Sequence, residues 1–485
     1  MTPTANMIRH LSTRAVACTA LALALGLAAC ASTAPVDART ALAEPAPPMH
    51  PAHGIPGIGP EQLDPQWWIS RLADPDTPIL DGARIAARNA TLFAEEASMH
   101  VLAELPTPLP GAQVREMITA LSAPPANPRY DMQGTQLPQT TLDGLQAALA
   151  LDAIPAQVPA RFGLVVRRTA LRAFPTRLRA FSTPGDTDID RFQESALFPG
   201  DPVAIVHASA DGQWLFVISP RYAAWIEADA LAEGSRERVL GYGQRSPYRI
   251  VTGATVRTVF TPEAPAVSEL QLDMGQRIPL ARLPPNLPVN GQHPYTAWTL
   301  DLPVRQADGR LAFAPALLPR IADSQARVLP LTRANLIRQG FKFLGERYGW
   351  GHDYNGRDCS GFISEIYRSM GLEIPRNTSR QRVNPALERI EFDARSSAAQ
   401  REAALARLDI GDLVFIPGHV VMVIGRIGDE PYVIHDVLGG HAFDANGQLQ
   451  RLQLNGVSVT PLRPMRFDAD TGYVDRITHI VRLHP

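Results

Sequence analysis

The amino-acid sequence predicts a multidomain protein of the α+β class. At 485 residues the chain is too long for one compact core, so several domains are expected. The spacing of apolar residues is mostly helical up to about residue 155 and changes to short strand-like runs, broken by Pro and Gly, from about 160 to 320. Both patterns occur in the remaining C-terminal part. A net charge of −2, with no run of basic residues, argues against a nucleic acid partner.

The first thirty residues predict an export signal. Arg9 and Arg14 precede a short apolar stretch, which ends in Leu27-Ala-Ala-Cys30 with small residues before the cysteine. This stretch is too short for a membrane-spanning helix, which needs about 20 residues. The segment resembles a bacterial lipoprotein signal, and an ordinary secretory signal is the alternative.

The lipoprotein resemblance implies that residues 1–29 are removed and that Cys30 is lipidated. Acyl chains at that position would anchor the protein to a membrane. Ala31, where other lipoproteins carry Asp, implies sorting to the outer membrane of a Gram-negative bacterium, with the protein in the cell envelope facing the periplasm. Residues 30–58 are rich in Ala and Pro and are expected to form a flexible tether.

Residues 59–157 are expected to form a helical N-terminal domain. Residues 114–121 give one amphipathic run, and an earlier helical pattern among Ala and Glu includes Ile85, Phe93 and Met99. Trp67 and Trp68 are interpreted as packing residues. Nothing in this domain suggests catalysis.

Two small β-barrels of about five strands each are predicted next, at residues 158–238 and 239–325. Asp211-Gly212 is expected to form a hairpin turn in the first barrel. The predicted strands of that barrel are Phe162–Thr169, Asp201–Ala208, Gln213–Ser219 and Ala223–Ile226. Those of the second begin at Thr255 and include Gln276–Leu283 and Tyr295–Pro303.

The last segment, residues 326–485, carries the residues that suggest catalysis. Thr332 can cap a first helix, and the sequence Tyr348-Gly-Trp-Gly follows it. The sequence Asp358-Cys359-Ser360-Gly-Phe then predicts a second helix with Asp358 as its N-cap and Gly371 as its stop. Cys359 would lie in the first turn, where the helix dipole is expected to lower the pKa of the thiol.

Cysteine usage also draws attention to Cys359. The chain has three cysteines, and Cys18 and Cys30 belong to the predicted signal and lipid site. Cys359 would then be the lone thiol of the mature chain, so no intrachain disulfide is expected. A lone exported cysteine is either an inert buried residue or a nucleophile, and the helix start favours the nucleophile.

Two histidines are candidates for the proton acceptor that a thiol nucleophile needs. His419 is expected at a turn between two strands, and His435 ends a later apolar run. One histidine could act as the base, and the second could hold its ring in the correct tautomer through Nδ1. Because the histidines form no helical H-x-x-x-H pair, a metal site is not expected, and no cofactor is predicted.

These motifs together resemble the NlpC/P60 family of papain-like cysteine peptidases. The resemblance rests on Tyr-Gly-Trp-Gly, Asp-Cys-Ser-Gly-Phe, Gly-Asp-Leu-Val-Phe and the two histidine strands, in the family's order. It extends more weakly to the preceding part, which is similar to lipoprotein-type members with an N-terminal stabilising domain and two bacterial SH3-like barrels. It implies a papain-like fold for residues 326–485.

The resemblance also implies an activity and a set of site residues. Family members cleave peptidoglycan stem peptides, typically between γ-D-glutamate and a diamino acid such as meso-diaminopimelate. Cys359 would be the nucleophile, His419 the general base and acid, and His435 the orienting residue. Tyr348 is expected near the oxyanion or the substrate, and Asp358 and Ser360 near the substrate.

Four further residues are implied to contact the substrate. In relatives with SH3 domains, the first barrel binds the free amine of an N-terminal L-Ala with an acid and a tyrosine, here Glu194 and Tyr222. A packing tyrosine and an exposed acid are the alternative. Thr378 and Ser379 fall where relatives carry substrate-binding hydroxyls.

Two other functions remain open from the sequence. A lipid-anchored protein that only binds peptidoglycan peptides would have the same barrels, but the retained Cys359 argues against it. An amidase or acyltransferase could use the same Cys-His fold. The oligomeric state and the preferred diamino acid are not defined by the sequence.

Overall fold

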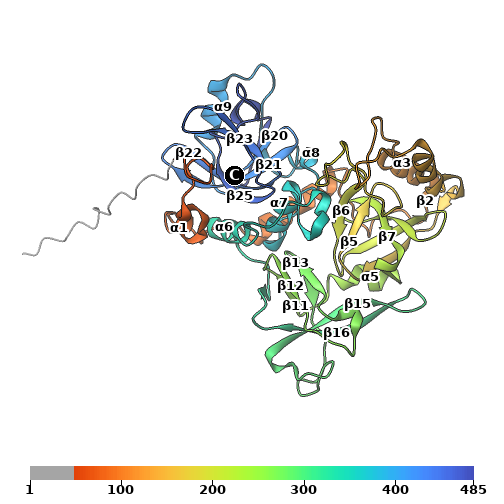
Figure 1. Cartoon of the computed structure of the whole chain (residues 1–485). Coiled ribbons are helices and arrows are strands. Elements are labelled where there is room, and N and C mark those ends of the chain that lie inside the picture. The colour runs from red at the N-terminus through yellow and green to blue at the C-terminus, as the bar shows by residue number, and fades with distance from the viewer. Residues whose placement is uncertain (1–48, 485) are drawn as a thin grey trace, which may run out of the picture. The chain divides into compact units, whose positions relative to one another are not determined.

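The computed structural model describes residues 49–484 (Figure 1). The predicted signal, the lipid site Cys30 and most of the predicted tether lie outside these residues. Among the residues that are described, no helix is both long and apolar enough to cross a bilayer.

The end of the predicted tether is packed rather than flexible. Pro56–Gly59 are buried, and the Tyr432 hydroxyl donates a hydrogen bond of 2.8 Å to the Gly57 carbonyl. Ile58, which is 3% exposed, enters the core of the C-terminal domain. The prediction that the tether reaches residue 58 is therefore wrong, because this apolar side chain anchors the segment.

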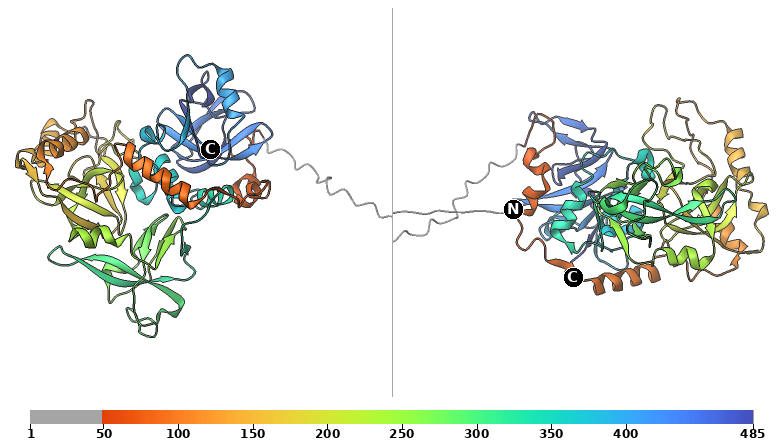
Figure 2. Two further views of the ribbon diagram at one scale, coloured as in Figure 1. Left: turned by 180° about the vertical axis from the view of Figure 1, so that it is seen from behind. Right: turned by 90° about the horizontal axis from the view of Figure 1, so that it is seen from below.

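The first helices lie against the C-terminal domain. They are α1 (Pro65–Ile69) and α2 (Gly82–Glu95), and β1 (Pro78–Leu80) pairs with β18 (Leu331–Thr332). Trp68 and Ile85 belong to the same core as the C-terminal helices, as the packing interpretation of Trp68 predicts. Figure 2 shows α2, in orange, alongside this domain, where the Arg88 side chain bonds the Leu483 carbonyl.

The later helices pack elsewhere. Helices α3 (Gly111–Leu121) and α4 (Gln139–Ala148) contribute Val114, Ile118 and Leu145 to the core of the following β domain. The short strands β2 (Leu109–Pro110) and β3 (Gln157–Val158) pair with each other. Residues 59–157 thus divide their apolar side chains between two neighbouring cores.

The first β domain is a single antiparallel sheet of seven strands, where about five were expected. The order is β10-β4-β7-β8-β9-β5-β6. The predicted strand Phe162–Thr169 is broken into two, and the Asp211-Gly212 turn joins β7 to β8 as predicted, with Gly212 at a φ of 68°. The strands are β4 (Arg161–Val165), β5 (Thr169–Arg172), β6 (Gln193–Leu197), β7 (Pro202–Ala208), β8 (Trp214–Ile218), β9 (Ala223–Glu227) and β10 (Leu231–Gly234). Helix α5 (Arg236–Tyr242) follows.

The second β domain contains three small sheets. One is β14-β11-β17, and the other two are the antiparallel pairs β12-β13 and β15-β16. Their bounds are β11 (Tyr248–Val251), β12 (Thr255–Arg257), β13 (Gln271–Asp273), β14 (Arg277–Pro279), β15 (Ala297–Arg305), β16 (Leu311–Pro319) and β17 (Ser324–Gln325).

The C-terminal domain packs helices against an antiparallel sheet of six strands, in the order β19-β26-β20-β21-β22-β25. Its helices are α6 (Arg333–Phe341), α7 (Cys359–Ser369), α8 (Thr378–Gln381) and α9 (Ala398–Leu405). Apolar residues of α6 and α7 share one core with alternate residues of β21 and β22. The strands are β19 (Glu388–Glu391), β20 (Leu413–Ile416), β21 (His419–Ile427), β22 (Glu430–Val437), β25 (Gly456–Pro461) and β26 (His479–Arg482), with a separate hairpin of β23 (Gly440–Phe443) and β24 (Leu449–Leu452).

Candidate active site

Cys359 is the first residue of α7, as predicted. The Asp358 side chain caps the helix by accepting a 2.8 Å hydrogen bond from the Gly361 amide. The Cys359 sulfur lies 3.8 Å from the Thr378 hydroxyl and also accepts from the backbone amide of Val420. These contacts hold the thiol between α8 and the start of β21.

Burial governs the ionisation of this thiol. Cys359 is 5% exposed, and burial, together with the negative charge of Asp358, raises the pKa of the thiol to about 12. The Val420 amide and the Thr378 hydroxyl act in the opposite direction but are weaker. The expectation of a lowered pKa for the Cys359 thiol is wrong, because the start of α7 is buried away from solvent. The thiol therefore needs a base to remove its proton.

The two predicted histidines lie side by side. His419 begins β21, one residue before the amide that contacts Cys359, and its Nε2 lies 2.8 Å from Nδ1 of His435. His435 Nε2 lies 3.0 Å from the Thr460 hydroxyl on β25. The His419 ring is held through its Nε2, so its Nδ1 is the nitrogen left to accept a proton.

Both imidazoles are neutral in this environment. Burial lowers the pKa of His419 to about 4, and burial with the neighbouring His419 lowers the pKa of His435 well below its usual value. If Nδ1 of His419 is the acceptor, its Nε2–H donates to His435, whose own Nε2–H donates to Thr460. The chain of hydrogen bonds is thus compatible with a tautomer suited to a general base.

Arg376 holds the cap of the catalytic helix. Its guanidinium donates to both carboxylate oxygens of Asp358, at 2.8 and 3.0 Å, and to the hydroxyls of Ser360 and of Ser195 on β6. Burial alone would raise the pKa of Asp358, but the charge of Arg376 holds this pKa at about 2. The sequence motifs gave no role to Arg376, since its partners are distant along the chain.

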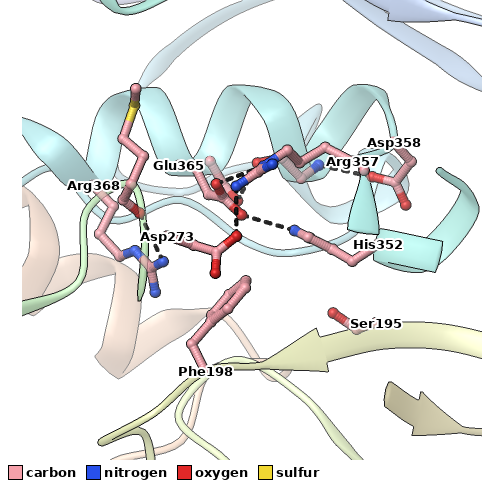
Figure 3. Close-up of polar contacts among 12 residues, drawn as sticks. Ser195, Phe198, Asp273, His352, Arg357, Asp358, Glu365 and Arg368 are labelled. Atoms are coloured by element: carbon pink, nitrogen blue, oxygen red, sulfur yellow. Dashed lines mark hydrogen bonds and ion pairs between the residues drawn. The ribbon is translucent and has the colours of Figure 1, made fainter. Parts of the chain in front are cut away.

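His352 continues this network toward a buried arginine (Figure 3). Because Arg376 can only donate, His352 Nδ1 accepts from it at 2.9 Å, and Nε2 must carry the proton that is donated to Glu365 at 3.0 Å. Burial and the nearby Arg376 lower the pKa of His352 to about 4, which agrees with a neutral ring. The sequence motifs did not indicate this contact of His352.

Arg357 lies at the centre of the network. Its side chain is fully buried and forms ion pairs with Glu365 at 2.9 Å, Glu346 at 2.9 Å and Asp273 of the second β domain at 2.6 Å. Burial alone would raise the pKa of Glu365, but the ion pair with Arg357 holds this pKa below its usual value. The network thus connects the catalytic helix with both β domains.

The structure brings Glu194 and Tyr222 together. The Tyr222 hydroxyl donates to the Glu194 carboxylate, and the Asn377 side chain also bonds that hydroxyl. Burial raises the pKa of both groups. Asn377, which contacts this pair, directly precedes Thr378, which contacts the thiol.

Two other predicted residues differ in their placement. Tyr348, which is 6% exposed, lines a groove that also contains His419. Ser379 is exposed on α8, next to Thr378.

Asp436 is a site residue that the sequence did not indicate. It follows His435, it is fully buried, and neither carboxylate oxygen has a hydrogen-bond partner among the described residues. Burial, with Glu346 and Asp358 nearby, raises its pKa to about 9, so the group is a neutral acid at pH 7. A neutral Asp436 adds no negative charge beside the thiol.

A buried cysteine at a helix start, with a pair of hydrogen-bonded histidines on neighbouring strands, is an arrangement typical of papain-like cysteine peptidases. Residues 345–463 match the family model of NlpC/P60, and residues 179–227 match that of an SH3 domain of the SH3b1 type. The C-terminal domain is therefore an NlpC/P60 peptidase domain, and the first β domain contains a bacterial SH3 domain. The predicted family resemblance and α+β fold class are confirmed.

The chain is similar to one peptidase in sequence and to one solved peptidase structure in fold. The chain is 27% identical over 154 residues to Dipeptidyl-peptidase 6 of Lysinibacillus sphaericus; the alignment covers 31% of this chain and about half, 49%, of that relative. The fold is similar to that of an NlpC/P60 endopeptidase from Photobacterium damselae subsp. piscicida, with a TM-score of 0.69, 16% identity, and coverage of 86% of this chain and 96% of that chain.

Proposed function

We propose that the protein hydrolyses the bond between γ-D-glutamate and meso-diaminopimelate in peptidoglycan stem peptides that begin with a free L-Ala. The observation that carries the proposal is the contact series that runs from the Cys359 thiol to Thr378 and, through the neighbouring Asn377, to Tyr222 and Glu194. A nucleophile and a carboxylate suited to an ammonium group lie at its two ends. The similarity to a dipeptidyl-peptidase also supports the proposed hydrolysis.

The proposed reaction begins with proton transfer from Cys359 to Nδ1 of His419. The thiolate attacks the γ-carbonyl of the glutamate, and the Cys359 amide and the Tyr348 hydroxyl stabilise the oxyanion. Burial and the Cys359 thiol raise the pKa of Tyr348, so its hydroxyl stays protonated and can donate. His419 then protonates the leaving amine, a thioester remains, and water releases the dipeptide with His419 as base.

The lipid anchor on Cys30 and the periplasmic face of the outer membrane are proposed from the signal sequence alone. An anchored peptidase in that place would meet peptidoglycan fragments directly.

Hydrolysis of L-Ala-γ-D-Glu-meso-diaminopimelate tests the proposed function. The mature protein is expected to release L-Ala-D-Glu and diaminopimelate, as detected by mass spectrometry, while Cys359→Ala releases neither, because no thioester can form. Circular dichroism of the variant controls for folding. Equal cleavage by both proteins would reassign the nucleophile, and no cleavage by either would contradict the proposed reaction.

Blocking the amine of the substrate tests the amine-binding role of Glu194 and Tyr222. N-acetylation of L-Ala removes the positive charge, so kcat/KM is expected to fall by about 10- to 100-fold, the effect of one lost charged hydrogen bond. Glu194→Gln is expected to lower kcat/KM similarly for the free peptide and to change little for the acetylated one. Equal turnover of the two peptides by the unmodified protein would exclude this pocket.

A further inference from the structure

A pocket opens beside His419. We call it the β-side pocket; it has a volume of about 400 Å³ and is bordered by His419, the turn from β22 to β23, and the β23–β24 hairpin. Its lining includes two arginines, Arg451 and Arg466, and no Asp or Glu. Among the described residues, the pocket therefore presents positive charge without an acidic side chain of its own.

The two arginines differ in how firmly they are held. Arg466 donates to the carbonyls of Asp468, at 3.0 Å, and Ala469, at 2.7 Å, and its guanidinium lies over the Phe443 ring. Arg451 lies on β24 and is exposed, and it forms no ion pair with any carboxylate in the described part of the chain. Arg451 is thus a cation available to a bound ligand, while Arg466 mainly supports the surrounding loop.

The position of the pocket suggests which part of a substrate enters it. Tyr348 and His419 line the pocket and also belong to the catalytic centre. The Glu194–Tyr222 pair, and the residues Thr378 and Asn377 that connect it with Cys359, do not line this pocket. If the amine of the peptide binds to Glu194, as the proposed function requires, the group beyond the scissile bond extends into the β-side pocket.

Charge then discriminates between the possible leaving groups. The diaminopimelate of a stem tripeptide carries two carboxylates and one ammonium group, whereas lysine in that position carries one of each. A carboxylate at the side-chain end can pair with Arg451, while the ammonium of lysine meets like charge. Amidation of the same carboxylate removes the pairing but keeps the size.

We infer that the β-side pocket receives the leaving diamino acid and selects one with a free carboxylate at the end of its side chain, with Arg451 as the specificity-determining residue. This inference rests on the proposed function and extends it from the bond to the choice of leaving group.

Competing substrates test the inference. We would measure kcat/KM for L-Ala-γ-D-Glu peptides ending in meso-diaminopimelate, in side-chain-amidated diaminopimelate and in L-lysine. The unmodified protein is expected to prefer the free diaminopimelate peptide by about tenfold or more, the effect of one charge-assisted contact. Arg451→Gln is expected to remove most of that preference, and Arg451→Glu to favour the lysine peptide.

Arg407, which is exposed and does not line the pocket, provides the matched control: Arg407→Gln is expected to keep the preference. Because Arg451 is exposed, its variants are expected to fold normally, and activity on the lysine peptide reports this directly. Equal cleavage of all three peptides, or an unchanged preference in both Arg451 variants, would overturn the inference alone. If none of the peptides is cleaved, the proposed function is contradicted and the inference falls with it.

Discussion

Arg357→Met is expected to destabilise the protein by about 3–5 kcal/mol, which is typical of breaking a buried ion pair. The guanidinium is fully buried among Glu365, Glu346 and Asp273. Its removal leaves three carboxylates close together, with the nearby Arg168, 3.8 Å from Asp273, as a weaker partner. Methionine fills part of the volume but supplies no charge. Urea unfolding followed by fluorescence measures the loss as a lower midpoint.

A surface arginine provides the control for this variant. Arg389 pairs with Glu391 at 2.7 Å, but both side chains are substantially exposed, at 40% and 56%. Arg389→Met is therefore expected to cost less than about 1 kcal/mol. Should Arg357→Met yield no folded protein, Arg357→Lys keeps the charge and is expected to give an intermediate loss. A midpoint unchanged from the unmodified protein would mean that the network contributes little to stability.

His419→Ala is expected to lower kcat for the diaminopimelate tripeptide by about 10³-fold or more. With the pKa of the Cys359 thiol raised to about 12, very little thiolate exists at neutral pH without a base, so the variant loses both the nucleophile and the proton donor for the leaving amine. Steady-state kinetics with circular dichroism as a folding control measure the effect.

Two further variants, one of a threonine and one of another histidine, serve as comparisons for His419→Ala. Thr460→Val removes only the last hydrogen bond of the chain through His435 and is expected to cost about tenfold or less. His293→Ala, at an exposed position of the second β domain, is expected to keep full activity. Retained activity in His419→Ala would assign the base to another group.

The sequence predicted those parts of the site that depend on local signals. The Asp358 cap, the start of α7 at Cys359 and the strands that carry His419 and His435 are each visible in a few consecutive residues. The pairing of the histidines also follows, since β21 and β22 are neighbours in the sheet. Local chemistry and chain order are sufficient for these features.

The parts that the sequence did not predict depend on tertiary packing. The direction of the Cys359 pKa shift is set by burial beneath β21, which no local pattern reports. Nothing near Arg357 in the sequence indicates its buried ion pairs, because one partner, Asp273, lies 84 residues earlier in the chain. The seven strands of the first β domain likewise include β5 and β10, whose pairing partners are distant in the chain.

The burial of Cys359 also affects how readily its thiol is oxidised. Peroxides and disulfides react with thiolates that solvent can reach, and a protonated, buried thiol offers them neither charge nor access. With His419 as the proposed base, the thiol is deprotonated only during the reaction, and it is thereby protected from sulfenic acid formation and from mixed disulfides. The same burial that slows its ionisation preserves the lone thiol for its substrate.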